Sequence, residues 1–371
     1  MSNTAPRPPR TSWGRAILTA VGGAVVVGLV LLAFIWPTLT SSVHNLPVAI
    51  GGNSQQVSAL KSAIRAKSPG TFDFVAVSGK TDAEKLIRTR AVYGAILLES
   101  KPQVLTASAN GVAVVQILDG VATEIQSNAN AAAKAAVASA IAAHQAPAGT
   151  VAPTITVTVT DVVPLVSKDS RGLGLSAAAF PLALGGMLGG ILIALLVTGS
   201  WRRLLAVAVY SILGGVVVTV VMQNVFGVLD GNYLLTIAAL TLAMAGTASF
   251  VVGMNALIGT PGVAVGSVVT TLIGNPLSAA TQPLQFLVGP WGAVGQWFVP
   301  GASTTLIRDI AYFPDSNPKF AWLVLGGWAV LGIIATVAGH FRNQRDITPA
   351  PAEEGITDVV PTQAPKHAAM V

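Results

Sequence analysis

Apolar residues are concentrated in six long stretches, one near the amino terminus and five after a gap of about 135 residues. At ~1.5 Å of rise per residue, some 20 residues cross a hydrocarbon core of ~30 Å, so every stretch is long enough to span a bilayer. None of them contains Asp, Glu, Lys or Arg. The pattern predicts a membrane protein whose spans are all α-helical, in a one-plus-five arrangement. The stretches are Ala16–Trp36, Gly174–Thr198, Leu204–Phe226, Tyr233–Asn255, Ile258–Thr281 and Phe320–His340.

The interval between the first and second stretches, residues 37–173, has the pattern of a separate α/β domain. Short runs with apolar residues at every second position predict strands, and runs with an apolar face at helical spacing predict helices. The expected strands are Leu46–Gly51, Phe72–Val77, Val92–Leu98, Val104–Ala107 and Ile155–Val163. The expected helices are Ser54–Lys67, Asp82–Arg90 and Gly111–His144.

Basic residues in the short connections predict the orientation, because short cytoplasmic loops carry an excess of Lys and Arg. We therefore expect the tails, residues 1–15 and a disordered 341–371, to be cytoplasmic, and residues 37–173 to be extracytoplasmic at the plasma membrane. The spans 16–36 and those within 174–340 would then be part of a multi-pass protein in the lipid bilayer. The basic residues are Arg7, Arg10 and Arg15, Arg202 and Arg203 between the second and third stretches, and Arg342 and Arg345 after the last.

One further apolar segment, Pro283–Pro300, is nearly long enough to span but is broken by Pro283, Pro290, Gly292, Gly295 and Pro300. A seventh span would also move Arg342 and Arg345 outside, against the positive-inside rule. Irregular backbone at membrane depth is tolerated only where protein or a water-filled cavity covers it. The region 282–319 is therefore predicted to be re-entrant or interfacial.

The amino-acid composition excludes several classes of function. Hydrophobic residues make up 52% and charged residues 10% of the chain, far below the ~25% charged residues of a typical soluble protein. The net charge of +6 is spread without a basic stripe and interleaved aromatics, which argues against nucleic acid as a partner. The chain has no cysteine, and its four histidines are scattered, so no metal or cofactor site is expected.

A short phosphate-loop-like run, Ser78-Gly79-Lys80-Thr81, lacks the earlier glycine of the full motif, because Phe74 stands at that position. We interpret the run as an ordinary turn between a strand and a helix. With no ATPase motif and no catalytic constellation, the chain itself is not expected to be an enzyme.

Two features within the spans are candidates for helix packing or gating. Closely spaced glycines on one helix allow another helix to approach, either within one subunit or between subunits. An Asn-Pro pair in the fifth stretch removes a backbone hydrogen bond and should kink that helix. The residues are Gly185, Gly186, Gly189 and Gly190, and Asn275 with Pro276.

The layout and several stretches resemble ABC-2-type transporter permeases, of the branch that includes phage-infection-protein-like membrane proteins. The resemblance covers about residues 15–340 and lies in Leu46–Gly51, Asp82–Leu98, Asp161–Gly172 and the proline-broken segment Gly274–Asp309, with Pro300 and Arg308. It implies a homodimeric permease with an export path between subunits, and ATP hydrolysis on a separate cytoplasmic subunit.

Two functions from different classes remain open. Spans without charge disfavour ion-coupled transport, so an exporter would move an amphipathic or apolar substrate with energy from the separate ATPase. Arg202 and Arg203 would be the docking contacts for that ATPase, although their loop is barely a turn, and their other role is to anchor the topology. The alternative is a non-transporting, membrane-anchored surface or scaffold protein whose outer domain binds a partner.

Overall fold

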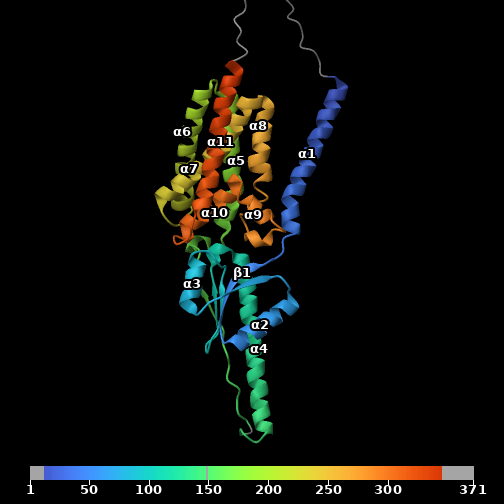
Figure 1. Ribbon diagram of the computed structural model, residues 1–371, viewed down its shortest axis with the longest axis vertical. Coiled ribbons are helices and arrows are strands. Elements are labelled where there is room, and N and C mark those ends of the chain that lie inside the picture. Colours follow the sequence, from blue (N-terminus) through green and yellow to red (C-terminus); the bar gives the residue numbers. More distant parts are fainter. Residues whose placement is uncertain (1–11, 148, 345–371) are drawn as a thin grey trace, which may run out of the picture.

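The computed structural model describes residues 12–147 and 149–344, which form a helical bundle with an α/β domain at one end (Figure 1). We call the end of the bundle beside this domain the domain end, and the opposite end, where α1 begins and α11 finishes, the far end. The predicted tails, 1–15 and 341–371, lie mostly outside the described residues.

Five helices of the described chain are long and apolar enough to cross a membrane. They make this a multi-pass membrane protein by length and composition, and each has mean hydropathy of 1.9 or more. Helix α6 ends in a π-helical turn, η3, over Val220–Val225. The five are α1 (Trp13–Leu39), α5 (Leu173–Leu196), α6 (Ser200–Thr219), α7 (Tyr233–Ile258) and α11 (Lys319–Gln344).

The prediction of six helical spans is not confirmed, because the fifth stretch, Ile258–Thr281, does not form one continuous helix. Gly259, at φ +74°, ends α7, and α8 (Thr260–Ser267) begins with Pro261 in its first turn. A π-helical turn, η4 (Val268–Ile273), continues α8, and turns follow. The helical part, Thr260–Ile273, is therefore a short apolar helix rather than a span.

Short helices occupy the chain between η4 and α11. They are η5 (Leu284–Phe286), α9 (Trp291–Gly295) and α10 (Val299–Tyr312). Helices α8 and η4 descend from the far end, and the short helices fill the rest of the bundle toward the domain end (Figure 1). Because α10 buries Ala302 and Leu306 against α7 and α11, this irregular backbone is covered by protein.

The α/β domain is built on a five-stranded mixed sheet in the order β2-β1-β3-β4-β5. Strand β1 pairs in parallel with β2 and β3, β3 pairs antiparallel with β4, and β4 pairs in parallel with β5. The strands are β1 (Leu46–Gly52), β2 (Phe72–Ala76), β3 (Ala95–Leu98), β4 (Gln103–Thr106) and β5 (Thr158–Asp161). The domain's longer helices are α2 (Ser54–Lys67), α3 (Lys80–Arg88) and α4 (Val112–Ala142).

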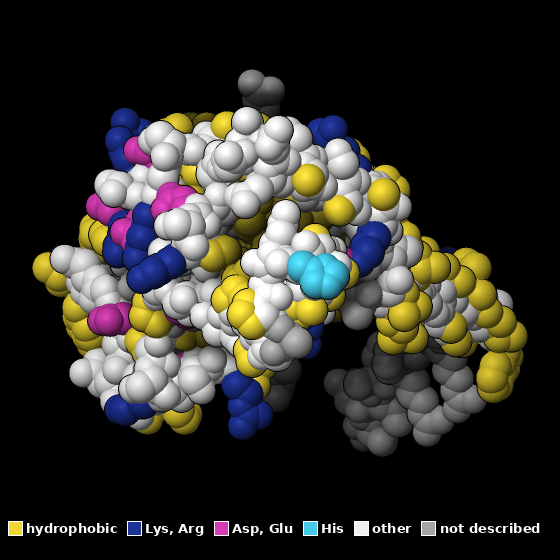
Figure 2. Space-filling model, turned by 90° about the horizontal axis from the view of Figure 1, so that it is seen from below, with side chains coloured by type: hydrophobic (Ala, Val, Ile, Leu, Met, Phe, Trp, Pro, Cys, Tyr) yellow, Lys and Arg dark blue, Asp and Glu magenta, His cyan; other side chains and the backbone are white. Residues whose placement is uncertain are grey.

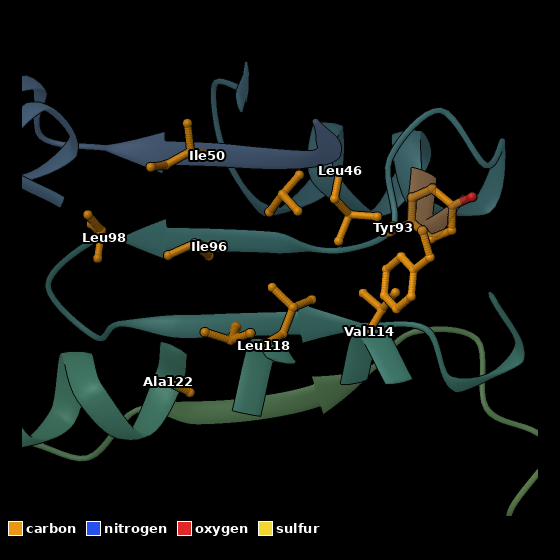
Figure 3. Close-up of a cluster of buried hydrophobic side chains, with 11 residues drawn as sticks. Leu46, Ile50, Tyr93, Ile96, Leu98, Val114, Leu118 and Ala122 are labelled. Carbon is orange, nitrogen blue, oxygen red and sulfur yellow. The ribbon is translucent and has the colours of Figure 1, made fainter. Parts of the chain in front are cut away.

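Both faces of the sheet are covered. On one face, alternate side chains of β1 and β3 pack on Val114, Leu118 and Ala122 of α4 (Figure 3). On the other face, Ala83 and Ile87 of α3 fill the core. The alternation of β1, with Val48 on one side and Ala49 on the other, supplies both cores from a single strand.

The membrane half of the chain completes both of these cores. Phe286 of η5 belongs to the cluster under α4, and Phe313, which follows α10, belongs to the cluster under α3. Backbone hydrogen bonds from Ser42 to Phe286 and from His44 to Gln285 add to the contact. The α/β domain is thus docked on the bundle through buried aromatic side chains.

Helix α1 stands away from the other helices (Figure 1). Hydrophobic side chains cover it on the protruding arm at the right of Figure 2. Its ring contacts are at its last turns, where Phe34 meets Phe180 at 5.8 Å and Trp36 meets Trp291 at 6.2 Å between ring centroids. An apolar helix exposed on all sides requires lipid or another apolar surface around it.

Candidate functional site

A buried ion pair fixes the α/β domain to α10. Arg90, which follows α3, donates through Nη1 to the Asp309 carboxylate at 2.5 Å, and its Nε donates to Asn110 Oδ1 at 3.2 Å. The Arg90 guanidinium also lies 5.3 Å from the centroid of the Phe313 ring. The side chains of Arg90 and Asp309 are only 16% and 7% exposed, so the pair is largely withdrawn from water.

Beside this pair, a cavity of about 420 Å³ lies between the α/β domain and the bundle. We call it the junction cavity. Residues from the start of α4, the segment before α5, the start of α5 and the end of α10 line it, and its volume is in the range of small-molecule sites. Its apolar wall includes Val112, Leu165 and Leu175, and its polar lining includes Asp169, Arg171, Arg308 and Tyr312.

Arg308 is the half-buried cation of the junction cavity. Its Nη2 donates to the carbonyl of Ala280 at 3.1 Å, and among the described residues it forms no ion pair. Burial, reinforced by the nearby Arg90, lowers the pKa of Arg308 to about 10, so the guanidinium is still protonated at neutral pH. A guanidinium has five N–H donors, so Arg308 retains donors for a ligand.

The other polar groups of the cavity are largely engaged by the protein. The Asp169 carboxylate accepts hydrogen bonds from the backbone N–H groups of Leu173 and Gly174, at 2.9 and 2.8 Å, which caps α5. Tyr312 donates to the carbonyl of Val228 at 3.0 Å. Burial raises the pKa of Tyr312 to about 12, so it remains a neutral phenol. Arg171 is exposed at the rim. Of the charged side chains that line the cavity, the two arginines, Arg308 and Arg171, are left available to a ligand.

A line of buried polar groups leads from the broken helix toward this cavity. Ser267 Oγ, Thr271 Oγ1 and Asn275 Oδ1 are buried without a hydrogen-bond partner in the described part of the chain. Their four-residue spacing keeps successive side chains close along α8, η4 and the turn that follows. Buried polar groups without partners are rare, and π-helical turns often occur at functional sites.

The same line continues through Gln296, which follows α9, onto α10. Gln296 Nε2 donates to the carbonyl of Ser278 at 3.4 Å, and Thr305 Oγ1 donates to Gln296 Oε1 at 2.6 Å. Arg308 follows Thr305 by three residues on α10, which is about one helical turn. Polar groups thus follow one another from Ser267 to Arg308, along the chain and through these hydrogen bonds, in a bundle whose spanning helices carry Asp, Glu, Lys or Arg only near their ends.

The candidate glycines lie at close helix contacts within the chain. A Cβ at Gly189 would stand 2.1 Å from the Tyr210 ring, and one at Gly190 would stand 3.0 Å from Ala248 Cα. A Cβ at Gly186 would be 3.0 Å from Thr247 Cβ, whereas Gly185 has only Met244 at 4.0 Å. Asn275 and Pro276 follow η4 in a turn, so they end the broken helix rather than kink a span.

The two basic residues between α5 and α6 differ in their surroundings. Arg203 donates through Nε to the carbonyl of Val197 at 2.7 Å and through Nη2 to that of Ala194 at 2.9 Å. It thereby caps the carbonyl end of α5, where a cation is also favoured by the helix dipole. Arg202 is exposed and makes no ion pair with the described residues.

The junction cavity was not predicted from the sequence. In the sequence Arg308 stands out only as part of a stretch that carries the family resemblance, and although Tyr312 follows it by one helical turn, Asp169 lies far from it along the chain. The sequence does carry a signal for a functional arginine. Arg308 follows the apolar segment Pro283–Pro300, and its nearest carboxylate along the chain is that of the adjacent Asp309. Within the described ranges, no group of three or more His, Asp or Glu residues is arranged to hold a metal ion.

Comparison with known proteins yields no assignment: no protein-family model, no curated protein and no solved structure matches this chain.

Proposed function

We propose that this protein is the membrane permease subunit of an ABC-type exporter, which moves an amphipathic or apolar substrate while a separate subunit hydrolyses ATP. The observation that supports it most is the broken helix α8–η4 with the turn after it, in which three buried side-chain oxygens have no hydrogen-bond partner among the described residues. Discontinuous helices at membrane depth are typical of transporters, because they expose polar backbone and side chains to a path.

The same observation favours transport over a scaffold role. A scaffold gains nothing from unpartnered polar atoms inside its bundle, each of which costs about 1–3 kcal/mol of stability. Spans without Asp, Glu, Lys or Arg in their interiors disfavour coupling to protons or sodium. The energy for movement therefore comes from outside this chain.

A homodimer in the plasma membrane, with both termini cytoplasmic, is part of this proposal. Helix α1 offers an apolar surface that the described part of its own chain leaves exposed. In this orientation Arg202 lies on the cytoplasmic side and is the better docking contact for the ATPase, because Arg203 already caps α5.

The test is purification of the full chain from its native membrane in mild detergent, followed by identification of bound proteins and an ATPase assay. We expect a subunit with a complete phosphate-binding loop, and ATP hydrolysis that a substitution of its loop lysine abolishes. A preparation in which no ATPase co-purifies, even after cross-linking in the membrane, would favour the surface or scaffold function.

The docking contact has its own test. Arg202→Lys keeps the positive charge that fixes topology but loses the bidentate geometry of a guanidinium. We expect this variant to retain less of the ATPase subunit than the wild type. Unchanged retention and unchanged ATP hydrolysis would remove Arg202 from the mechanism. Arg203→Lys is unsuitable as the test because it also disturbs the cap of α5.

A further inference from the structure

We propose that the junction cavity binds the anionic head group of an amphiphile, with Arg308 as its inner cation, Arg171 as its outer cation, and the apolar wall as the contact for the first part of the alkyl chain. This inference deepens the proposed function by naming a substrate class, and it rests on that function only for the idea that the bound molecule is moved. Binding can be measured without any ATPase.

The charges around the cavity are the first argument. Asp169 lines it and Asp309 is adjacent to Arg308, and both of these carboxylates are already engaged: Asp309 with Arg90, and Asp169 with two backbone N–H groups of α5. Arg308 has one hydrogen bond, to a carbonyl. A half-buried guanidinium without a carboxylate is costly in the empty protein, and an anionic phosphate or carboxylate group offsets that cost.

The backbone beside Arg308 is the second argument. Ala279, a buried alanine, adopts φ +51°, in the left-handed region that non-glycine residues seldom occupy. The next residue, Ala280, supplies the carbonyl that holds Arg308. Strain of this kind, about 1–3 kcal/mol, persists where the surroundings impose it and is concentrated at binding sites. Here it occurs in the turn that presents the Ala280 carbonyl to Arg308.

The walls of the cavity indicate the rest of the ligand. Val112, Leu165 and Leu175 give one side an apolar surface. Exposed polar side chains at Gln116 and Thr281 accompany Arg171 at the rim. A charged centre beside an apolar wall matches a molecule with an anionic group and an attached alkyl chain better than a free inorganic anion.

A small void beyond the junction cavity marks the direction in which the alkyl chain of the ligand would continue. It lies among α5, α7 and α10, next to Ala179, Leu182, Ser303 and Ile307. On α5, Ala179 is one turn beyond Ser176 of the junction cavity. At about 20 Å³ the void holds no more than a water molecule, so α5 and α10 must separate before an alkyl chain can enter.

The test uses the cysteine-free full chain in uncharged maltoside micelles. A single cysteine in place of Thr281, labelled with bimane, reports on the cavity rim, and a bimane at Ser127 on α4 is the control for nonspecific partition into the micelle. Dodecyl phosphate is the probe. Dodecyltrimethylammonium, which is cationic, tests whether the site requires a negative charge on the ligand. Inorganic phosphate tests whether binding requires the alkyl chain.

We expect a saturable fluorescence change with dodecyl phosphate at position 281 and none at 127. Dodecyltrimethylammonium should give no saturable change, and inorganic phosphate should bind at least about tenfold more weakly. Arg308→Gln should lower the affinity for dodecyl phosphate at least about tenfold, because the substitution removes a charge-assisted contact. Arg308→Lys should retain more of the binding than Arg308→Gln. Arg88→Gln, an exposed arginine on α3, should leave it unchanged.

Equal binding of the anionic and cationic amphiphiles by the wild type would overturn the inference without any variant. Equal affinity for inorganic phosphate would overturn the amphiphile class. Wild-type affinity in a folded Arg308→Gln variant would remove Arg308 from the site. None of these results bears on whether an ATPase partner exists, so failure of this inference is distinguishable from failure of the proposed function.

Discussion

At the scale of the residue, the pair formed by Arg90 and Asp309 should matter more for stability than any exposed pair. Asp309→Asn leaves the Arg90 guanidinium largely buried without its counter-charge, which typically costs about 3–5 kcal/mol. We expect the unfolding midpoint of the detergent-purified protein to fall clearly in a thermal scan. The double variant Arg90→Met, Asp309→Leu should recover part of the stability lost in Asp309→Asn, because neither charge is then left unpaired.

The matched control at this scale is the exposed pair of Lys67 and Glu124, whose side chains are 67% and 45% accessible. Because solvent screens such a pair, Glu124→Gln should change the free energy of unfolding by less than about 1 kcal/mol. If the two carboxylate substitutions lowered the unfolding midpoint equally, the Arg90–Asp309 pair would not hold the domain to the bundle.

At the scale of the element, the packing of α5 depends on the absence of a side chain at Gly189. An added Cβ would stand 2.1 Å from the Tyr210 ring, so Gly189→Ala must displace α6 or the ring and should cost about 1–3 kcal/mol. Gly326→Ala in α11 is the control, since no atom lies within 4 Å of its added Cβ. Thermal unfolding of the two variants compares them, and a midpoint for Gly189→Ala as high as that of Gly326→Ala would contradict this packing.

At the scale of the whole molecule, the α/β domain and the segment 282–319 both lie at the domain end, so we predict that they share one side of the membrane. Single cysteines at Ser127 and Val288, both exposed and at the domain end, should react with an impermeant maleimide on intact cells. A cysteine at Thr260, exposed at the far end, should react only after permeabilisation. Labelling of Val288 and Thr260 from the same side would contradict the topology.

Local sequence patterns were sufficient for most of the elements. The expected helix Ser54–Lys67 matches α2, and the expected strand Leu46–Gly51 differs from β1 by one residue. The four stretches that became α5, α6, α7 and α11 also lie where predicted, within a few residues. In these segments the spacing of apolar residues and the length needed to cross lipid depend on the segment itself, so no knowledge of neighbours is required.

The fifth apolar stretch shows why composition alone was insufficient. Its hydropathy fits a span, but Gly259, Pro261 and the Asn275-Pro276 pair interrupt it, and the surrounding helices cover the freed backbone. Whether such breaks kink a helix or end it depends on whether other protein can cover the exposed groups. That is a property of the packed bundle.

The sequence by itself therefore determined that this is a membrane protein with an inserted α/β domain. The length of an apolar stretch and the alternation of apolar residues in a strand both depend only on consecutive residues. Only the tertiary structure decided which polar groups work together. Arg308 meets the Ala280 carbonyl and lines a cavity with Asp169, and Arg203 turns back to cap α5. Such contacts join residues that are distant in the chain, and their charge and hydrogen bonding are set by burial, which arises only when the elements pack together.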